Sequence, residues 1–217
     1  MKVFRKDMSL YLVTDRSWLG NRNLPDVVEE AIRGNVSFVQ IREKNINYQE
    51  FKKLALELKV ITDKYHIPFV INDNIELAID IDADGVHLGQ DDMETSKARK
   101  LLGNNKILGI SVNTVEQAVL AEKEGADYLG IGSIFNTGTK LDAKVINMDI
   151  IKNIVDSVSI PTVGIGGINK DNIHLLENSK LDGIAVVSAI LKEKDIELSA
   201  KNLSRLVKEN LYDDKDI

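Results

Sequence analysis

Eight short apolar segments alternate with helical patterns along the chain, and this alternation restricts the possible fold more than any other feature. The clearest helical pattern, at 48–65, places its apolar residues at three- and four-residue steps. Each apolar segment lacks strict polar alternation, as expected of strands that are buried on both faces of a parallel sheet. The segments lie at 10–14, 37–41, 68–71, 84–88, 106–110, 127–131, 160–165 and 182–187.

Eight strand–helix units favour a single α/β domain, a (β/α)8 TIM barrel with a phosphate-binding site at its C-terminal face. The competing fold, an open doubly wound sheet, requires a glycine-rich turn after the first strand, and "YLVTDRSW" has none. There is no linker rich in Pro, Gly or Ser. We therefore predict one domain over 1–217, with an ordered barrel at 8–209 and a frayed acidic tail at 210–217.

Polar residues mark several of the predicted helix ends. Asn47 and Thr114 stand where N-caps are expected, and Gly125 stands where a helix should end. Asn169 is predicted to cap a helix that leads to Ile173. These signals support the helical crossovers between the strands.

Composition excludes several classes of protein. The chain has no cysteine, which removes disulfides and thiolate chemistry and is typical of a reducing cytoplasm. Its net charge is -6 and no basic stripe is visible, so we expect no nucleic-acid partner. No window approaches the roughly 18 apolar residues of a membrane span, and the N-terminus lacks a signal-peptide pattern. We predict a cytoplasmic enzyme without a membrane partner.

In a (β/α)8 barrel the loops after the strands build the active site. Arg42 and Lys44 follow the second strand, and they alternate with Gln40 so that all three side chains can point the same way. Asp73 and Asp92 follow the neighbouring third and fourth strands. Two such carboxylates beside cations suit Mg²⁺, which binds one or two carboxylates and phosphate oxygens. For either aspartate alone, a role as a helix cap or turn residue stays open.

Two further segments have the composition of phosphate-binding loops. The stretch "GSIFNTGTK" (132–140) combines hydroxyls, glycines and a lysine directly after the sixth strand. The stretch "GIGGIN" (164–169) follows the seventh strand, and Gly166 and Gly167 allow a close approach of backbone to ligand. Taken alone, 132–140 is better explained as an ordinary surface loop, and ordinary turn geometry explains 164–169 as well as a phosphate site does.

The sequence does not indicate that the three histidines form a catalytic centre. His66 lies at a helix-to-strand junction, His174 lies early in a predicted helix, and His87 is expected to have a core role inside the barrel. No Ser–His–Asp arrangement or three-histidine cluster is visible, which argues against hydrolases of those classes.

Taken together and in this order, the motifs at the strand ends resemble those of the thiamin phosphate synthases (thiamin-phosphate pyrophosphorylases). The resemblance runs from "YLVTD" to "VVSAI" and includes "QIREK", "IND", "DGVHLGQDD", "GIS", "ADYLGIGSIFNTGTK" and "VGIGGI". It implies a Mg²⁺-dependent transferase with two small-molecule substrates. The enzyme would condense 4-amino-2-methyl-5-hydroxymethylpyrimidine diphosphate with a thiazole phosphate by a dissociative mechanism, and would release thiamin phosphate and diphosphate.

The resemblance also implies roles for particular residues. Arg42, Ser111 and Lys140 would be catalytic, and Asp73 and Asp92 would bind Mg²⁺. The segment 40–44 would line the pyrimidine diphosphate site, and the remaining ligands would be shared between the two substrates. The residues implied in substrate binding are Gln40, Ile41, Arg42, Glu43, Lys44, Asn72, Ser111 and Lys140 for the pyrimidine diphosphate, Thr137, Gly138 and Thr139 for the thiazole, and Gly167, Val187 and Ser188 for its phosphate.

Two positions depart from the family pattern. Ser133 stands where the family often has proline, and we expect it only to loosen the loop. Asn113 stands where histidine is common. The related thiazole tautomerase is expected to use a histidine there, and asparagine cannot carry a proton, so Asn113 counts against a tautomerase.

Two more functions are weighed against the synthase from the sequence. A barrel that merely binds a thiamin precursor would not need the carboxylate pair. A phosphosugar isomerase would need an acid–base pair that the sequence does not show. The oligomeric state is not indicated.

Overall fold

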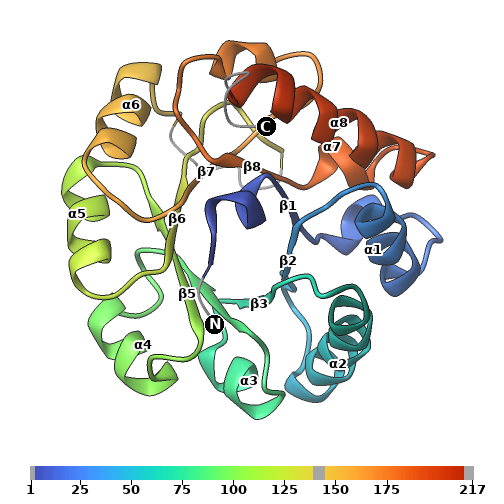
Figure 1. Cartoon of the computed structure of the whole chain (residues 1–217). Helices are drawn as coiled ribbons and strands as arrows, with labels where there is room; N and C mark the ends of the chain where they lie inside the picture. Colours follow the sequence, from blue (N-terminus) through green and yellow to red (C-terminus); the bar gives the residue numbers. More distant parts are fainter. Residues whose placement is uncertain (1–2, 139–144, 213–217) are drawn as a thin grey trace.

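The computed structural model describes residues 3–138 and 145–212. Eight parallel strands form a closed barrel in sequence order, with β1 hydrogen-bonded to β8. Figure 1 shows the helices as an outer ring around these strands. The predicted (β/α)8 barrel is confirmed. The strands are β1 (Leu10–Val13), β2 (Phe38–Ile41), β3 (Phe69–Asn72), β4 (Gly85–Leu88), β5 (Ile107–Val112), β6 (Tyr128–Ile131), β7 (Thr162–Ile165) and β8 (Gly183–Val186).

The helices begin largely where polar caps predict. The Asn47 side chain accepts the Glu50 N–H at 3.0 Å, and the Thr114 hydroxyl accepts the Gln117 N–H at 3.2 Å. The α-helices are α1 (Leu24–Arg33), α2 (Tyr48–Tyr65), α3 (Ile75–Asp80), α4 (Thr95–Leu102), α5 (Val115–Lys123), α6 (Met148–Asp156), α7 (Ser188–Leu191) and α8 (Ile196–Leu211), and the 3-10 helices are η1 (Arg5–Met8), η2 (Arg16–Trp18) and η3 (Ile173–Leu176).

The crossover between β7 and β8 differs from the expected α-helix. It contains only the single 3-10 turn η3, and the Asn169 side chain does not cap it. Asn169 instead accepts the N–H of Asp171 at 2.9 Å, which closes a local turn. Asparagine readily makes such turns, so the same residue type serves either structure.

Side chains of the strands alternate between two apolar layers. Tyr11, Phe38 and Tyr128 meet inside the barrel, where the Tyr11 and Phe38 ring centroids are 4.5 Å apart. Leu12 and Ile41 belong to the larger layer between the strands and the surrounding helices. Both layers are apolar, which explains why the strands read as continuous apolar runs.

One end of the barrel is covered by η1, which appears in dark blue over the middle of the ring in Figure 1. Met8 at its end is fully buried, and a β-carbon at Gly183 would lie 1.9 Å from the Met8 carbonyl oxygen. Arg5 of η1 forms an ion pair with Asp182 at 2.6 Å. The opposite end, at the carboxyl ends of the strands, holds the cavity described below.

The last helix extends beyond the expected barrel limit. Helix α8 continues to Leu211, and the Tyr212 hydroxyl donates to the Asp182 carbonyl at 2.8 Å. Residues 210–212 therefore belong to the packed barrel and not to a frayed tail. Within the part of the chain that the structure describes, no helix is long and apolar enough to cross a membrane.

Candidate active site

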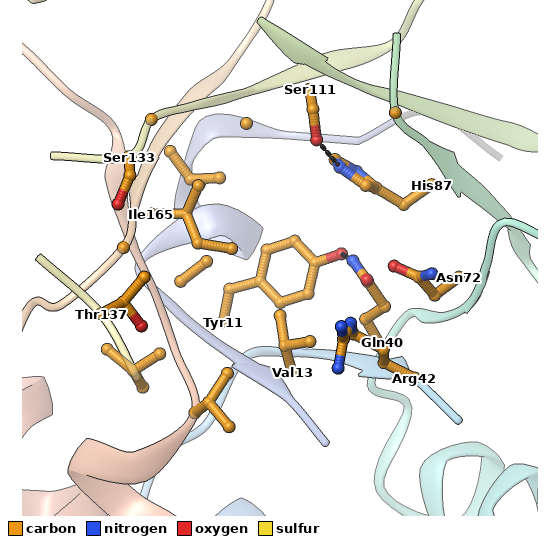
Figure 2. Close-up of a pocket in the computed structure, with 18 of the residues that line it drawn as sticks. Tyr11, Val13, Gln40, Arg42, Asn72, His87, Ser111, Ser133, Thr137 and Ile165 are labelled. Carbon is orange, nitrogen blue, oxygen red and sulfur yellow. Dashed lines mark hydrogen bonds between the residues drawn. The ribbon is translucent and has the colours of Figure 1, made fainter. Parts of the chain in front are cut away.

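A cavity of about 900 Å³ opens at the carboxyl ends of the strands. Its walls come from all eight strands or the loops that follow them, so residues distant in sequence meet there. Figure 2 shows several of them, including Arg42, Asn72 and Ser111, together with the ring of Tyr11. The predicted site residues that line it are Gln40, Arg42, Lys44, Asn72, Asp73, Asp92, Ser111, Thr137, Gly167, Val187 and Ser188.

Of the predicted binding residues that the structure describes, three are not among those that line the cavity. Ile41 is fully buried in the layer between the strands and the helices. The Glu43 carboxylate accepts a hydrogen bond from Arg16 Nε at 2.8 Å, and burial raises the pKa of Glu43. Gly138 is exposed outside the cavity lining. Thr139 and Lys140 lie outside the described residues.

The carboxylates of Asp73 and Asp92 are neighbours in the loops that follow β3 and β4. Lys44 Nζ lies 2.9 Å from Asp73 Oδ2, and Asp92 Oδ2 accepts the Gly89 N–H at 2.6 Å. Partial burial raises the pKa of Asp92, and the neighbouring Asp73 carboxylate raises it further, whereas the Gly89 N–H lowers it. A cation shared by the two carboxylates would relieve their repulsion.

The carboxylate pair is not a complete metal centre by itself. In residues 3–138 and 145–212 no three His, Asp or Glu side chains gather as metal ligands. Mg²⁺ does not need a cage made only of protein, because it keeps waters and takes oxygens from phosphate groups. The pair therefore fits a cation that arrives together with a phosphorylated ligand.

On the opposite side of the barrel, a glycine turn after β7 lines the cavity and packs against the loop after β6. Gly166 and Gly167 after β7 have φ angles of 103° and 66°, in the left-handed region that favours glycine. A β-carbon at Gly167 would lie 2.4 Å from the Asn136 carbonyl oxygen, because the loop after β6 packs directly against this turn. The Phe135 N–H donates to the Gly166 carbonyl at 2.9 Å and joins the two loops.

Ser133 does more than the sequence predicts. It is buried, and its hydroxyl donates to the Phe135 carbonyl at 2.7 Å. The serine therefore supplies a hydrogen bond within this loop, and the expectation that it only loosens the loop is wrong.

A chain of hydrogen-bonded side chains crosses the floor of the cavity. Gln40 Nε2 donates to the Tyr11 hydroxyl at 2.5 Å, and the Tyr11 and Tyr128 hydroxyls are 2.8 Å apart. The Tyr128 hydroxyl lies 2.9 Å from His87 Nδ1, and His87 Nε2 lies 2.9 Å from Ser111 Oγ. Figure 2 shows Gln40 beside the Tyr11 hydroxyl, and His87 joined to Ser111 by a dashed line.

Burial keeps the titratable side chains of this hydrogen-bonded series uncharged near neutral pH. It lowers the pKa of His87 to about 4 and raises the pKa values of Tyr11 and Tyr128. His87 thus has the predicted buried position and also lines the cavity.

Tyr11 lines the cavity although the sequence motifs do not single it out. The signal that could have found it is the alternation along the first strand, which points Tyr11 and Val13 inward and Leu12 outward.

The family model, the curated relatives and a solved structure at 39% identity all carry the name of one enzyme. The family model described as thiamine monophosphate synthase matches residues 10–190. The thiamine-phosphate synthase of Clostridium acetobutylicum is 50% identical over 204 residues, which cover 94% of this chain and 97% of that protein. That of Clostridium tetani is 48% identical over 198 residues, covering 91% and 95%. The solved structure of thiamine phosphate pyrophosphorylase from Pyrococcus furiosus is 39% identical, has a TM-score of 0.87 and covers 96% of this chain and 99% of that chain.

Proposed function

This chain belongs to the thiamine monophosphate synthase family, and on that premise we propose how its cavity carries out the family's reaction. The protein is a transferase that condenses 4-amino-2-methyl-5-hydroxymethylpyrimidine diphosphate with a thiazole phosphate to give thiamin phosphate and diphosphate. The observation that carries the proposal is a single cavity with two polar edges. One edge lies at β2–β4 and the other at β6–β8, on opposite sides of a closed barrel.

The edge at β2–β4 receives the pyrimidine diphosphate. Arg42 and Lys44 supply positive charge to the diphosphate, and Asp73 and Asp92 would hold Mg²⁺. When bound, Mg²⁺ neutralises diphosphate oxygens and so improves the leaving group. The neighbouring carboxylates and the raised pKa of Asp92 support this assignment, because a cation offsets their repulsion. Gln40, Asn72 and Ser111 bind the rest of this substrate.

The edge at β6–β8 receives the thiazole phosphate. Gly167, Val187 and Ser188 line the cavity there, and they hold the phosphate through backbone and hydroxyl groups. Thr137 positions the thiazole. Gly138, Thr139 and Lys140 complete the loop in this proposal, with Lys140 as a cation near the departing diphosphate.

The chemistry requires orientation and charge stabilisation. The C–O bond of the pyrimidine diphosphate breaks with its electron pair leaving on diphosphate, and the electron-rich aminopyrimidine stabilises the resulting cation. The thiazole nitrogen then forms the new C–N bond. Such a step needs no protein nucleophile, in keeping with the burial that keeps the Tyr11 phenol in its neutral, weakly nucleophilic form. Limiting attack by water on the cation is part of the same requirement.

A direct assay tests this assignment. The purified protein is incubated with both substrates, with and without Mg²⁺, and thiamin phosphate and diphosphate are quantified. The Michaelis constants of both substrates are then measured for Lys44→Ala and Ser188→Ala. We expect Lys44→Ala to weaken chiefly the pyrimidine diphosphate and Ser188→Ala chiefly the thiazole phosphate. The reverse pattern would refute the assignment of the two edges. The cytoplasmic location and the absence of a nucleic-acid partner stay predictions from the sequence.

A further inference from the structure

Tyr128 lies at the centre of the hydrogen-bonded floor, yet it does not line the cavity. Its side chain is fully buried, with its ring centroid 5.5 Å from that of Phe38 and 5.9 Å from that of Tyr11. A β-carbon at Gly109 would lie 2.2 Å from Tyr128 Cζ, so glycine at that position makes room for the phenol. Any effect of the Tyr128 hydroxyl on a ligand must therefore pass through its neighbours.

The hydrogen bonds from Gln40 to Ser111 all run the same way, with each group donating to the next one. With the Gln40 amide oriented as in the structure, Nε2 donates to the Tyr11 oxygen, and the single Tyr11 hydrogen is left for the Tyr128 oxygen. Tyr128 then has its own hydrogen for His87 Nδ1, which accepts only if it carries no proton. The proton of the neutral ring therefore sits on Nε2 and is donated to Ser111 Oγ.

This direction determines what Ser111 offers to a ligand. Its oxygen accepts from the imidazole, so its own hydrogen is not used on the ring. Ser111 is half-buried and lines the cavity, so that hydrogen is available to a bound molecule. With the opposite direction the hydroxyl would donate to the ring and present only lone pairs to the cavity.

We propose that Tyr128 is a positioning residue that, through the Nε2–H form of His87, sets Ser111 as a hydrogen-bond donor to a lone pair of the bound pyrimidine diphosphate. No proton is transferred; the chain only orients hydroxyl groups. The identity of the ligand rests on the proposed function. The direction of the hydrogen bonds rests only on the orientation of the Gln40 amide and on the contacts among Tyr11, Tyr128 and His87.

The first test reads the tautomer directly. The imidazole nitrogen resonances of ¹⁵N-labelled protein are recorded by NMR, and His87 is identified among the three histidines with His66→Gln and His174→Gln variants. We expect wild-type His87 to be the pure Nε2–H form and Tyr128→Phe to give a mixture of tautomers. An Nδ1–H form in the wild type, or an unchanged tautomer in Tyr128→Phe, overturns the proposal. The wild-type measurement decides even if the variant fails to fold.

The second test asks whether Tyr128 acts through Ser111. Tyr128→Phe should lower kcat/KM for the pyrimidine diphosphate about tenfold, the size of one oriented hydrogen bond, and leave the KM of the thiazole phosphate within about twofold. Tyr65→Phe is the matched control, because it removes a hydroxyl that binds Glu29 on the outer helices. It should change neither constant.

A double-mutant cycle completes the second test. In a Ser111→Ala background, Tyr128→Phe should cause no further loss, because the residue through which it acts is gone. An equal loss in both backgrounds overturns the proposal. If the protein makes no thiamin phosphate at all, the proposed function fails. The His87 tautomer seen by NMR then decides by itself the direction of the hydrogen bonds.

Discussion

At the scale of single residues, the Asp92 carboxyl has a raised pKa, first because it is partly buried and then because Asp73 lies beside it. An acid with a higher pKa in the folded state contributes stability below its unfolded pKa and loses it as pH rises through the folded pKa. In EDTA, Asp92→Asn should therefore melt at a higher temperature than wild type near pH 7, and the difference should shrink as pH falls toward about 4. Melting curves across this range measure it. A difference that grows toward acid pH would contradict the prediction.

The same carboxylate should control the metal requirement of the reaction. Asp92→Asn should raise the Mg²⁺ concentration needed for half-maximal activity by at least about tenfold, which is the cost of losing even an outer-shell partner at many metal sites. Titration of the initial rate with Mg²⁺ measures this. Asp91→Asn is the adjacent control and should shift the requirement by less than about twofold. Equal shifts in the two variants would mean that Asp92 is not a ligand.

At the scale of elements, β5 and β6 fit together through a glycine. A β-carbon at Gly109 would overlap Tyr128, whose ring Tyr11 and Phe38 hold in place. Gly109→Ala should therefore destabilise the protein by about 1–3 kcal/mol, the usual cost of overpacking a core. Urea unfolding measures it. In a Tyr128→Leu background the same substitution should cost less, since the smaller side chain leaves room. An equal cost in both backgrounds would place the strain elsewhere.

The helices and strands can be predicted from the sequence. The directions in which their side chains point are harder to predict. Helix α2 has both the predicted ends, because Asn47 caps it and its apolar positions repeat regularly. The motif at 40–44 suggests one continuous lining surface, but strand alternation turns Ile41 outward into the layer against the helices. The Tyr128–His87 contact joins residues 41 positions apart, and the pairing of β4 and of β6 with β5 brings them together. Local sequence signals do not encode such a contact.

At the scale of the whole molecule, the buried His87 should make the free energy of unfolding depend on pH. Its pKa falls from the usual 6.5 to about 4 because burial disfavours the charged ring. A base with a lowered folded pKa contributes stability above its unfolded pKa and loses it as pH falls through the folded pKa. Between pH 6.5 and 4 the protein should lose about 3 kcal/mol of unfolding free energy through this group.

Denaturant unfolding at several pH values checks this coupling. The loss of stability between pH 6.5 and 4 should be smaller in His87→Gln than in the wild type. His174→Gln, which changes an exposed histidine in η3, should keep the wild-type pH dependence. If the His87 and His174 variants show the same pH dependence, burial of His87 is not the cause.

The pairing of β1 with β8 has a consequence for how the chain is made. Tyr11 and Leu12 pair with Phe38 and Val39 of β2, but their other partners are Ala185 and Val186 of β8. At about 5–20 residues per second, a ribosome delivers β8 roughly ten seconds or more after β1. Throughout that interval one edge of β1 has no strand to pair with, and the partly built sheet can join a second nascent chain. The barrel therefore cannot close before β8 has been made.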